Sequence, residues 1–321
     1  MTSQTNEALA LWTVAAGVAA IRAETLPPAG AGQTFVRALA SGVSRGTEAL
    51  VFAGRVPPSQ YAAMRAPLMG GDFPFPVKYG YSVVGRDPAA QRVFVLHPHQ
   101  DHFLAPDAMC IPVPDTVPTH RAVLAANMET AVNLLWDAAP LAGEHILVIG
   151  AGVVGLLAAS LLARIPATRV TVVDTRPERA ALAHRFGCAF ACQDQAPGQQ
   201  DLVVHTSASE SGLRLALDRA GFEGRIIEAS WYGDSAPAVP LGEAFHTRRL
   251  RLIATQVGSV APSMRGRRTH ADRLALALDL LADSAYDGLL QGTTRFADLP
   301  SAMPAILAPG GLCHVITYGA E

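Results

Sequence analysis

Apolar positions in the first third of the chain come in short runs separated by proline and glycine. The runs at residues 35–39 and 93–96 are typical, and they predict an irregular β-rich domain. A first strand is predicted over residues 11–19, because its aromatic and β-branched residues suit a pleated, buried surface. Gly17 permits a bend near the end of this strand.

The middle third of the chain alternates apolar strand-like runs with helical segments, which is the rhythm of βαβ units in a parallel sheet. Helices are predicted at residues 153–164 and 177–186, because Pro166 follows the first, Pro177 starts the second and Gly187 follows its last turn. Six strands, enough for a doubly wound sheet, are predicted at residues 146–149, 169–173, 189–192, 202–206, 225–229 and 250–255.

This rhythm stops after about residue 262. One amphipathic helix is predicted at residues 271–283, followed by short segments around Pro300, Pro304 and Pro309. We expect this tail to return to the first domain. The predicted organisation is therefore a discontinuous domain of residues 1–121 and 262–321, and a second domain of residues 122–261.

Composition narrows the class of protein. Half of the 321 residues are apolar and the net charge is -2, which favours a soluble two-domain protein with no nucleic-acid or membrane partner. The apolar stretch at residues 8–21 follows Glu7 instead of a cationic flank and is too short to span a bilayer, so we expect a cytoplasmic protein. No paired C-x-x-C motif occurs among the four scattered cysteines, Cys110, Cys188, Cys192 and Cys313, which suits a reducing compartment.

A glycine-rich motif, Gly150-Ala151-Gly152-Val153-Val154-Gly155, follows the first strand of the middle domain directly and opens its first helix. Gly150 permits a tight turn, Gly152 lets backbone N–H groups reach a diphosphate, and Gly155 allows the helix to pack closely on the strand. Val153 and Val154 would place their N–H groups at the positive end of that helix. The motif predicts a dinucleotide-binding Rossmann domain; the alternative is a turn that only packs a helix on a sheet.

An acidic residue about twenty positions further along supports the cofactor interpretation. Asp174 ends the next predicted strand, where its carboxylate would accept hydrogen bonds from the adenosine ribose. It would repel a 2′-phosphate, so NAD is favoured, although Arg176, beyond Thr175, leaves NADP possible. Ends of the later strands should line the nicotinamide half of the cofactor site, which nominates His205, Thr206, Ser207, Trp231, Tyr232, Gln256 and Val257.

Two segments of the first domain, residues 41–48 and 78–85, resemble those that carry the catalytic metal ligands in the medium-chain dehydrogenase/reductase superfamily. Its members join a GroES-like catalytic domain to a C-terminal cofactor domain, so the resemblance implies an α/β protein with a β-rich GroES-like domain and a six-stranded parallel Rossmann domain. It covers nearly the whole chain.

The metal ligands of zinc alcohol dehydrogenases are missing from these two segments. Ser44, or Arg45 in another alignment, stands in place of the cysteine, Tyr81 in place of the histidine and Ser82 in place of the glutamate. Neutral hydroxyl groups do not replace thiolate and imidazole as zinc ligands. The resemblance therefore implies a zinc-independent member, similar in these motifs to the bacteriochlorophyllide hydroxyethyl dehydrogenase branch.

Without zinc, carbonyl reduction needs another group to polarise or protonate the developing alkoxide. Tyr81 is the predicted hydrogen-bond donor, with Ser44 beside it and Thr47 and Glu48 behind it as a relay. The alternative is that Tyr81 only packs, with its hydroxyl group bonded to the protein.

A cluster of histidines, His97, His99 and His102, is the other unusual feature of the first domain. A strand-to-loop segment would place His97 and His99 on one face. Three interpretations stay open: a polar loop with solvated histidines, an acid–base or substrate contact, and a metal site.

Together these features predict an oxidoreductase that interconverts an alcohol and a carbonyl compound, with a small or medium organic substrate bound in a cleft between the domains. One alternative is an NADPH-dependent quinone or enone reductase. Another is a catalytically silent nucleotide-binding or scaffold protein that kept the fold and lost the chemistry. A homodimer is also expected, because the predicted last strand, residues 250–255, leaves a free sheet edge.

Overall fold

The computed structural model describes residues 7–319, so the outermost parts of the predicted first domain, residues 1–6 and 320–321, lie outside the described residues. The chain divides into two compact units. We call residues 1–126 with 274–321 the β-rich unit, and residues 127–273 the parallel-sheet unit. The boundaries between these units fall within helices α3 (Ala125–Ala138) and α7 (His270–Leu280).

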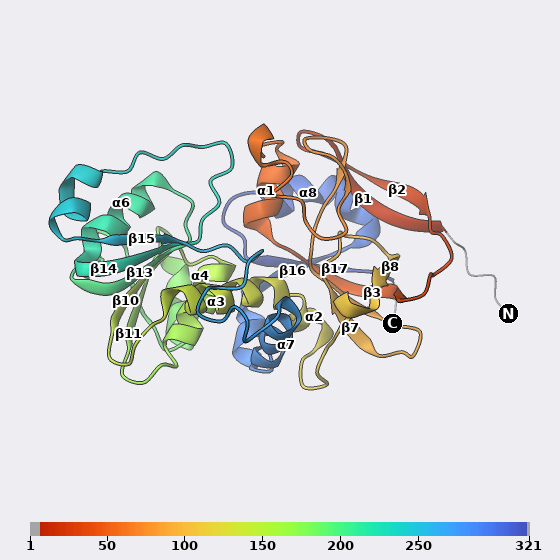
Figure 1. The fold of residues 1–321 in the computed structure, drawn as a ribbon. Coiled ribbons are helices and arrows are strands. Elements are labelled where there is room, and N and C mark those ends of the chain that lie inside the picture. Colours follow the sequence, from red (N-terminus) through yellow and green to blue (C-terminus); the bar gives the residue numbers. More distant parts are fainter. Residues whose placement is uncertain (1–6, 320–321) are drawn as a thin grey trace. The chain divides into compact units, whose positions relative to one another are not determined.

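Six parallel strands form the sheet of the parallel-sheet unit, as the sequence predicted. They lie in the order β12 (Ala189–Ala191), β11 (Arg169–Val173), β10 (His145–Ile149), β13 (Gln200–His205), β14 (Ala220–Glu228) and β15 (Arg251–Ala254). The green-to-cyan part of the ribbon in Figure 1 follows this sheet. The strand order reverses between β10 and β13, and ligands of such sheets bind beyond the carboxyl ends of the strands at that point.

Both faces of this sheet are buried, which explains its near-continuous apolar strands. Leu147 and Val203 belong to an apolar cluster with Leu217 of helix α6 (Glu210–Arg219). Ile146 and Val148 alternate with the residues of that face, so they point to the opposite face, where they are also fully buried.

The helices of the parallel-sheet unit begin where the sequence predicted and end one or two residues earlier. Helix α4 spans Val153–Leu162 and lies beside β10 and β11. The second predicted helix is a 3₁₀ turn, η3 (Pro177–Arg179), continued by α5 (Ala180–Arg185). Two short helical segments complete this unit, η4 (Gln193–Gln195) and η5 (Leu241–Phe245).

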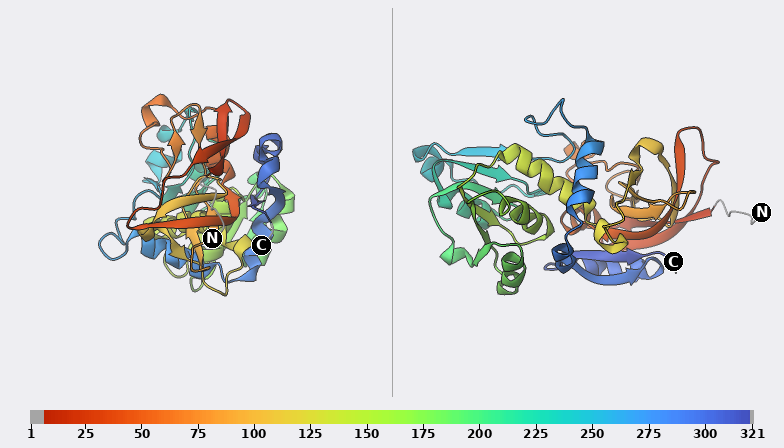
Figure 2. Two further views of the ribbon diagram at one scale, coloured as in Figure 1. Left: turned by 90° about the vertical axis from the view of Figure 1, so that its right-hand side faces the viewer. Right: turned by 90° about the horizontal axis from the view of Figure 1, so that it is seen from below.

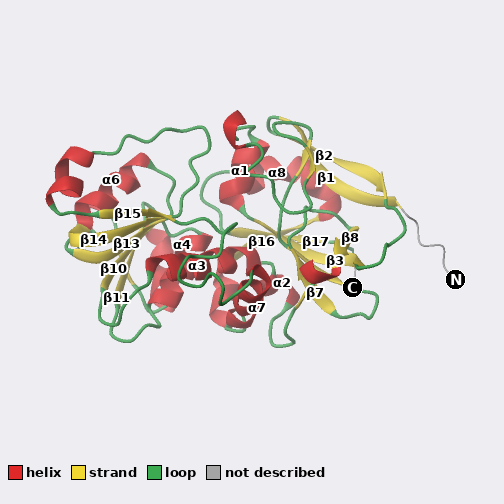
Figure 3. Ribbon diagram, in the orientation of Figure 1, coloured by secondary structure: helices red, strands yellow, loops and turns green. Residues whose placement is uncertain are grey.

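Two sheets dominate the β-rich unit, where Figure 3 shows mostly strands. The first has the order β2 (Val18–Thr25), β1 (Glu7–Ala15), β5 (Val77–Lys78) and β4 (Gly70–Gly71). The second has the order β16 (Leu290–Arg295), β17 (Cys313–Thr317), β3 (Gln33–Val43), β6 (Val83–Arg86), β7 (Arg92–Val95) and β9 (Ile111–Pro112), with β8 (His102–Pro106) also paired to β3.

The C-terminal strand β17 pairs antiparallel with β3, so Ile316 lies opposite Ser41. Figures 1 and 2 show this blue strand beside the red N-terminal strands. The helical segments of this unit are α1 (Arg45–Phe52), η1 (Pro58–Gln60), η2 (Asp107–Met109), α2 (Thr119–Ala122), η6 (Ser284–Leu289), η7 (Phe296–Asp298) and α8 (Leu299–Leu307).

One prediction about the β-rich unit was wrong. Residues 11–19 form a hairpin instead of one strand, because Gly17 has a φ of 71° and reverses the chain between β1 and β2. The short segment that holds Pro300 and Pro304 is the helix α8, which tolerates Pro300 in its first turn because N–H groups there have no partner within the helix. Among residues 7–319, no helix is both long and apolar enough to cross a membrane.

Candidate functional site

The glycine-rich loop of the parallel-sheet unit has the geometry that its sequence predicted. Gly150 follows β10 with a φ of 107°, a conformation that favours glycine. A side chain at Gly155 would collide with the carbonyl oxygen of Gly150, whereas the space around Gly152 is open. Gly152 caps α4, and the first N–H groups of that helix, including those of Val153 and Val154, have no partner within the helix. This loop therefore fits the diphosphate of a dinucleotide.

Hydrogen bonds from neighbouring strand ends hold the loop in place. The hydroxyl group of Thr206 donates to the carbonyl oxygens of Gly150, at 3.0 Å, and Ile149, at 3.1 Å. Asp174 lies at the end of β11, and its two carboxylate oxygens accept the backbone N–H groups of Ala151, at 2.7 Å, and Arg176, at 2.9 Å. Each oxygen has a second lone pair, so the carboxylate can still accept a ribose hydroxyl group.

The carboxyl ends of β13 and β14 bring together His205, Ser207, Tyr232 and Glu228, of which Glu228 was not predicted. Parallel register places Glu228 opposite His205. His205 Nδ1 lies 2.7 Å from Glu228 Oε2, its Nε2 lies 2.6 Å from Ser207 Oγ, and Tyr232 donates to Glu228 at 3.1 Å. Although burial raises the pKa of Glu228, hydrogen bonds and the attraction of His205 outweigh it, so the net pKa is lowered. These polar side chains lie at the carboxyl ends of two strands whose other residues are mostly apolar.

The other predicted cofactor residues, Thr175, Trp231, Gln256 and Val257, are not part of this hydrogen-bonded cluster. Thr175 and Gln256 are exposed, and Trp231 is partly exposed. The carbonyl oxygen of Val257 accepts a hydrogen bond from Arg273. Their place after the strand ends agrees with the sequence, and their role in cofactor binding stays a prediction.

In the β-rich unit, the hydroxyl group of Tyr81 donates to Ser44 Oγ at 2.6 Å. Burial raises the pKa of Tyr81 to about 12, while hydrogen bonds with Ser44 and Thr47 act in the opposite direction. The phenol therefore keeps its proton at neutral pH and can donate it in a hydrogen bond. The structure thus groups Tyr81, Ser44 and Thr47 as the sequence predicted, with Ser44 at the start of helix α1.

Glu48 joins this group to a buried histidine. Its Oε1 accepts the backbone N–H of Ser44 at 2.7 Å, and its Oε2 lies 2.9 Å from His99 Nε2. Ser41 Oγ lies 2.8 Å from both His99 Nδ1 and the hydroxyl group of Tyr318. Sequence analysis missed Ser41 and Tyr318, because only the pairing of β3 with β17 brings the two ends of the chain together. Glu48 and His99 also line a small cavity with Leu11, Tyr79 and Met303.

His97 is not part of a solvated loop, so that interpretation was wrong for both His97 and His99, which are 4% and 1% exposed. The imidazole of His97 stacks on Phe103 with 3.6 Å between ring centroids, and burial lowers its pKa to about 3. His102 pairs with Asp101 at 2.9 Å. Among residues 7–319, no group of three or more His, Cys, Asp or Glu side chains could hold a metal ion.

The positions of the family's metal ligands do not fit zinc. Ser44 and Tyr81 bond to each other through their hydroxyl groups, and Ser82 donates to the carbonyl oxygen of Val123. A catalytic zinc needs three protein ligands, normally thiolate, imidazole or carboxylate, and Glu48 is a group of that kind bonded to this set. The chemistry that these residues offer is hydrogen-bond donation.

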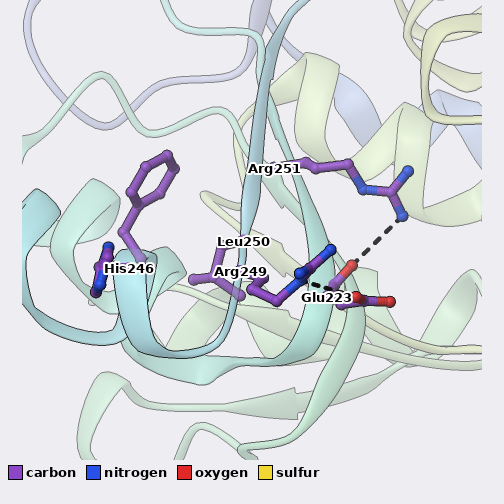
Figure 4. A pocket seen from close by; sticks show the side chains of 6 residues that line it. Glu223, His246, Arg249, Leu250 and Arg251 are labelled. Atoms are coloured by element: carbon purple, nitrogen blue, oxygen red, sulfur yellow. Dashed lines mark hydrogen bonds and ion pairs between the residues drawn. The ribbon is translucent and has the colours of Figure 1, made fainter.

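A larger cavity of about 550 Å³ lies elsewhere, along the last strand of the parallel sheet. Glu223, His246, Arg249, Leu250 and Arg251 line it (Figure 4), and none of them is a predicted site residue. Arg249 forms an exposed ion pair with Glu223 at 3.0 Å. An exposed ion pair contributes little energy, and the side chains that line this cavity include no hydroxyl or thiol group.

Comparison with known proteins shows distant relatives. No family model matches the chain. It is 30% identical over 118 residues to L-threonine 3-dehydrogenase of Rhizobium rhizogenes, a match that covers 36% of this chain and 33% of that protein. It is 24% identical over 240 residues to an uncharacterized zinc-type alcohol dehydrogenase-like protein of Haemophilus influenzae, covering 68% of this chain and 65% of the relative. The matches thus span less than two thirds of these relatives' own lengths.

The fold matches solved structures along its whole length. A short chain alcohol dehydrogenase from E. coli CFT073, complexed with NADH, has a TM-score of 0.77 at 16% identity, covering 97% of this chain and 99% of the other. L-idonate 5-dehydrogenase from Escherichia coli has a TM-score of 0.78 at 13% identity, covering 97% and 98%.

By sequence the chain is similar to an L-threonine 3-dehydrogenase and to a zinc-type alcohol dehydrogenase-like protein, and by fold it is similar to solved dehydrogenases. The predicted α/β fold, a β-rich domain with a Rossmann domain, is confirmed. Several of the relatives and solved structures carry dehydrogenase or reductase names, in agreement with the prediction of an oxidoreductase.

The buried His97 should make the protein sensitive to acid. Because its folded pKa of about 3 lies below the usual value of 6.5, the unfolded state binds the proton first, and stability falls as the pH drops below about 6.5. Between pH 7 and pH 5 we expect the wild type to lose about 2 kcal/mol more unfolding free energy than His97→Gln. Urea unfolding at the two pH values measures this difference.

His145→Gln is the matched control, because His145 is exposed. It should keep the pH dependence of the wild type. Equal losses in the wild type and in His97→Gln would show that the fold does not hold His97 in its neutral form.

Proposed function

We propose that this protein is a zinc-independent, NAD(P)(H)-dependent oxidoreductase that interconverts an alcohol and a carbonyl compound. The observation that carries the proposal is the glycine-rich loop, where helix α4 crosses close to the end of β10 at Gly150 and Gly155. The first N–H groups of this helix and the open space at Gly152 fit a diphosphate. Asp174 after the next strand supports NAD over NADP, because its carboxylate would repel a 2′-phosphate.

A bound nicotinamide ring would supply or accept the hydride. The residues of this chain would act on the oxygen atom of the substrate. Tyr81 donates its O–H to that oxygen and stabilises the negative charge that develops there during reduction. When the hydrogen of Tyr81 turns towards the substrate, Ser44 Oγ–H, 2.6 Å away, can donate to the phenol oxygen in return.

Glu48 would act behind this pair. Its carboxylate accepts the backbone N–H of Ser44 and faces His99, so it fixes the start of helix α1 and the position of the Ser44 hydroxyl group. We propose that Glu48 and His99 act as a relay and support for Tyr81. His97, which stacks in the core, is left out of this chemistry.

Nucleotide binding tests the proposal directly. Fluorescence titration should show NADH binding to the wild type below millimolar concentration. Gly152→Asp should weaken binding roughly tenfold or more, because a carboxylate beside a diphosphate costs on the order of 1.4 kcal/mol. The open space at Gly152 means that the side chain fits the free protein.

Gly198→Asp is the matched control, since that glycine also has open space around it and belongs to the same unit. It should bind NADH like the wild type. Failure of the wild type to bind either NADH or NADPH at millimolar concentration would contradict the cofactor assignment.

Hydride transfer tests the role of Tyr81. With a panel of alcohols, carbonyl compounds, enones and quinones, we expect turnover of an alcohol–carbonyl pair, and Tyr81→Phe should lower its rate roughly 100-fold while NADH binding is kept. Absorbance of NADH measures the rate. Tyr61→Phe, which changes another partly exposed tyrosine of the same unit, should keep the rate. An unchanged rate in Tyr81→Phe would remove Tyr81 from the reaction, and turnover of quinones or enones alone would favour the reductase alternative.

We also propose a homodimer that forms along β15. This strand is an edge of the parallel sheet, with Leu252 38% exposed and Phe222 of β14 68% exposed. A free apolar edge of this kind pairs readily with a second copy.

Sedimentation of the wild type at micromolar concentration should give a dimer. Leu252→Lys should shift the protein to the monomer, whereas Leu276→Lys, at a leucine of equal exposure on α7, should not. A monomeric wild type would contradict the proposed dimer.

A further inference from the structure

We propose that Ser207, His205 and Glu228 form a second catalytic site, which hydrolyses small carboxylic esters through an acyl group on Ser207. The proposal is independent of hydride transfer, because it uses neither a nucleotide nor the residues around Tyr81. It rests on these three side chains at the ends of β13 and β14, where Ser207 is within hydrogen-bond distance of His205 and His205 is within hydrogen-bond distance of Glu228.

The distances are those of a nucleophile, a base and an orienting acid. Ser207 Oγ lies 2.6 Å from His205 Nε2, and His205 Nδ1 lies 2.7 Å from Glu228 Oε2. A serine within reach of an imidazole that is itself oriented by a carboxylate is the general arrangement for an activated hydroxyl nucleophile. The parallel register of β13 and β14 fixes His205 and Glu228 side by side, so this arrangement sits on rigid strands.

The charge of Glu228 decides which nitrogen of His205 carries the proton. A carboxylate only accepts hydrogen bonds, so Nδ1 must donate to Glu228. In the neutral imidazole, Nε2 is then the basic nitrogen, and it faces the hydroxyl group of Ser207. Tyr232 donates to the same carboxylate at 3.1 Å and holds it in place. The histidine is thus in the tautomer that can take the proton of Ser207.

Accessibility separates this cluster from a similar one in the β-rich unit. Ser41, His99 and Glu48 have the same order of contacts, but Ser41 is completely buried, so no substrate can reach it. Ser207 is partly exposed, although His205 behind it is fully buried. A small ester can therefore reach the serine.

The segment after Ser207 also suits a developing oxyanion. Helix α6 begins at Glu210, and the first N–H groups of a helix attract negative charge, although that of Gly212 already donates to Ser209 Oγ at 3.1 Å. Gly212 in its first turn packs against Ser207 and His205, where any side chain would collide with both. The glycine thus leaves room for the hydroxyl–imidazole contact at the start of the helix.

The reaction balances without any redox partner. Ser207 Oγ attacks the carbonyl carbon of the ester, and its proton passes to His205 Nε2. The bond between the carbonyl carbon and the alcohol oxygen breaks, and the alcohol leaves with the proton from His205. Water then attacks the acyl-serine, again with His205 as the base, and releases the carboxylic acid and free Ser207. Glu228 is a positioning residue in these steps, because its carboxylate bonds to His205, Ser230 and Tyr232 and not to the reacting atoms.

The test uses the full-length protein without nucleotide. p-Nitrophenyl acetate should release nitrophenolate, and phenylmethylsulfonyl fluoride should stop this release and modify Ser207, as shown by mass spectrometry of peptides. Ser207→Ala should abolish both the release above background and the adduct. His205→Gln should slow acylation about 100-fold or more. Ser211→Ala changes an exposed serine in the first turn of helix α6 and should behave like the wild type.

The variant Glu228→Gln tests whether the carboxylate of Glu228 orients His205 or only packs against it. Loss of the negative charge should lower the apparent pKa of the base in the pH profile of acylation as well as the rate, whereas a structural defect would lower the rate alone. Folded wild-type protein that binds NADH but shows no adduct at Ser207 would overturn this proposal and leave the proposed function intact. Labelling of Ser207 in protein that binds no nucleotide would support this proposal and count against the other.

Discussion

The close crossing of helix α4 over the end of strand β10 is the constraint on which the nucleotide site depends. Gly150 turns the chain with a φ of 107°, and Gly155 lies so near the carbonyl oxygen of Gly150 that no side chain fits between them. The hydroxyl group of Thr206 bonds to that same carbonyl from the neighbouring strand. The crossing therefore ties β10, α4 and β13 together, and it aims the start of the helix at the edge where ligands of such sheets bind.

Polar groups gather at the same edge of this otherwise apolar sheet. Strands buried on both faces place most of their side chains among apolar neighbours, so polar residues follow mainly where the strands end. Asp174 after β11 bonds to the glycine loop, and Glu228 at the end of β14 bonds to His205. Each carboxylate is thus satisfied by a group from the adjacent strand end, which keeps the cost of partial burial low.

The sequence predicted the parallel sheet well because its signals are local. Apolar runs, Pro177 and the glycine motif each mark an element within a few residues, and β11 has the predicted bounds. The pairing of Ser41 with Tyr318 could not be predicted in this way, since 277 residues separate them and only the β3–β17 register brings them together. For the same reason Glu228 was missed, because nothing in its local sequence marks its partner on β13.

The prediction of a solvated loop at the histidine segment, residues 97–102, was wrong for a related reason. Three imidazoles within six residues suggest solvent or metal when only composition is considered, but burial of His97 against Phe103 depends on the packing of strands that the sequence does not reveal. Burial favours the neutral form of this imidazole, and stacking on a phenyl ring then replaces the water that it loses. His97 therefore behaves as an aromatic core residue.

Burial, aided by the carboxylate of Glu48, keeps the tyrosine hydroxyl groups around Tyr81 protonated. Burial is the main reason that the pKa values of Tyr79, Tyr81 and Tyr318 are raised, and the negative charge of Glu48 raises all three further. A zinc ion in the same place would have the opposite effect, because a cation favours the ionised form of nearby hydroxyl groups. Ser44 and Tyr81 thus offer neutral hydroxyl groups as hydrogen-bond donors. In the proposed reaction, the substrate oxygen would be stabilised by O–H groups that keep their protons.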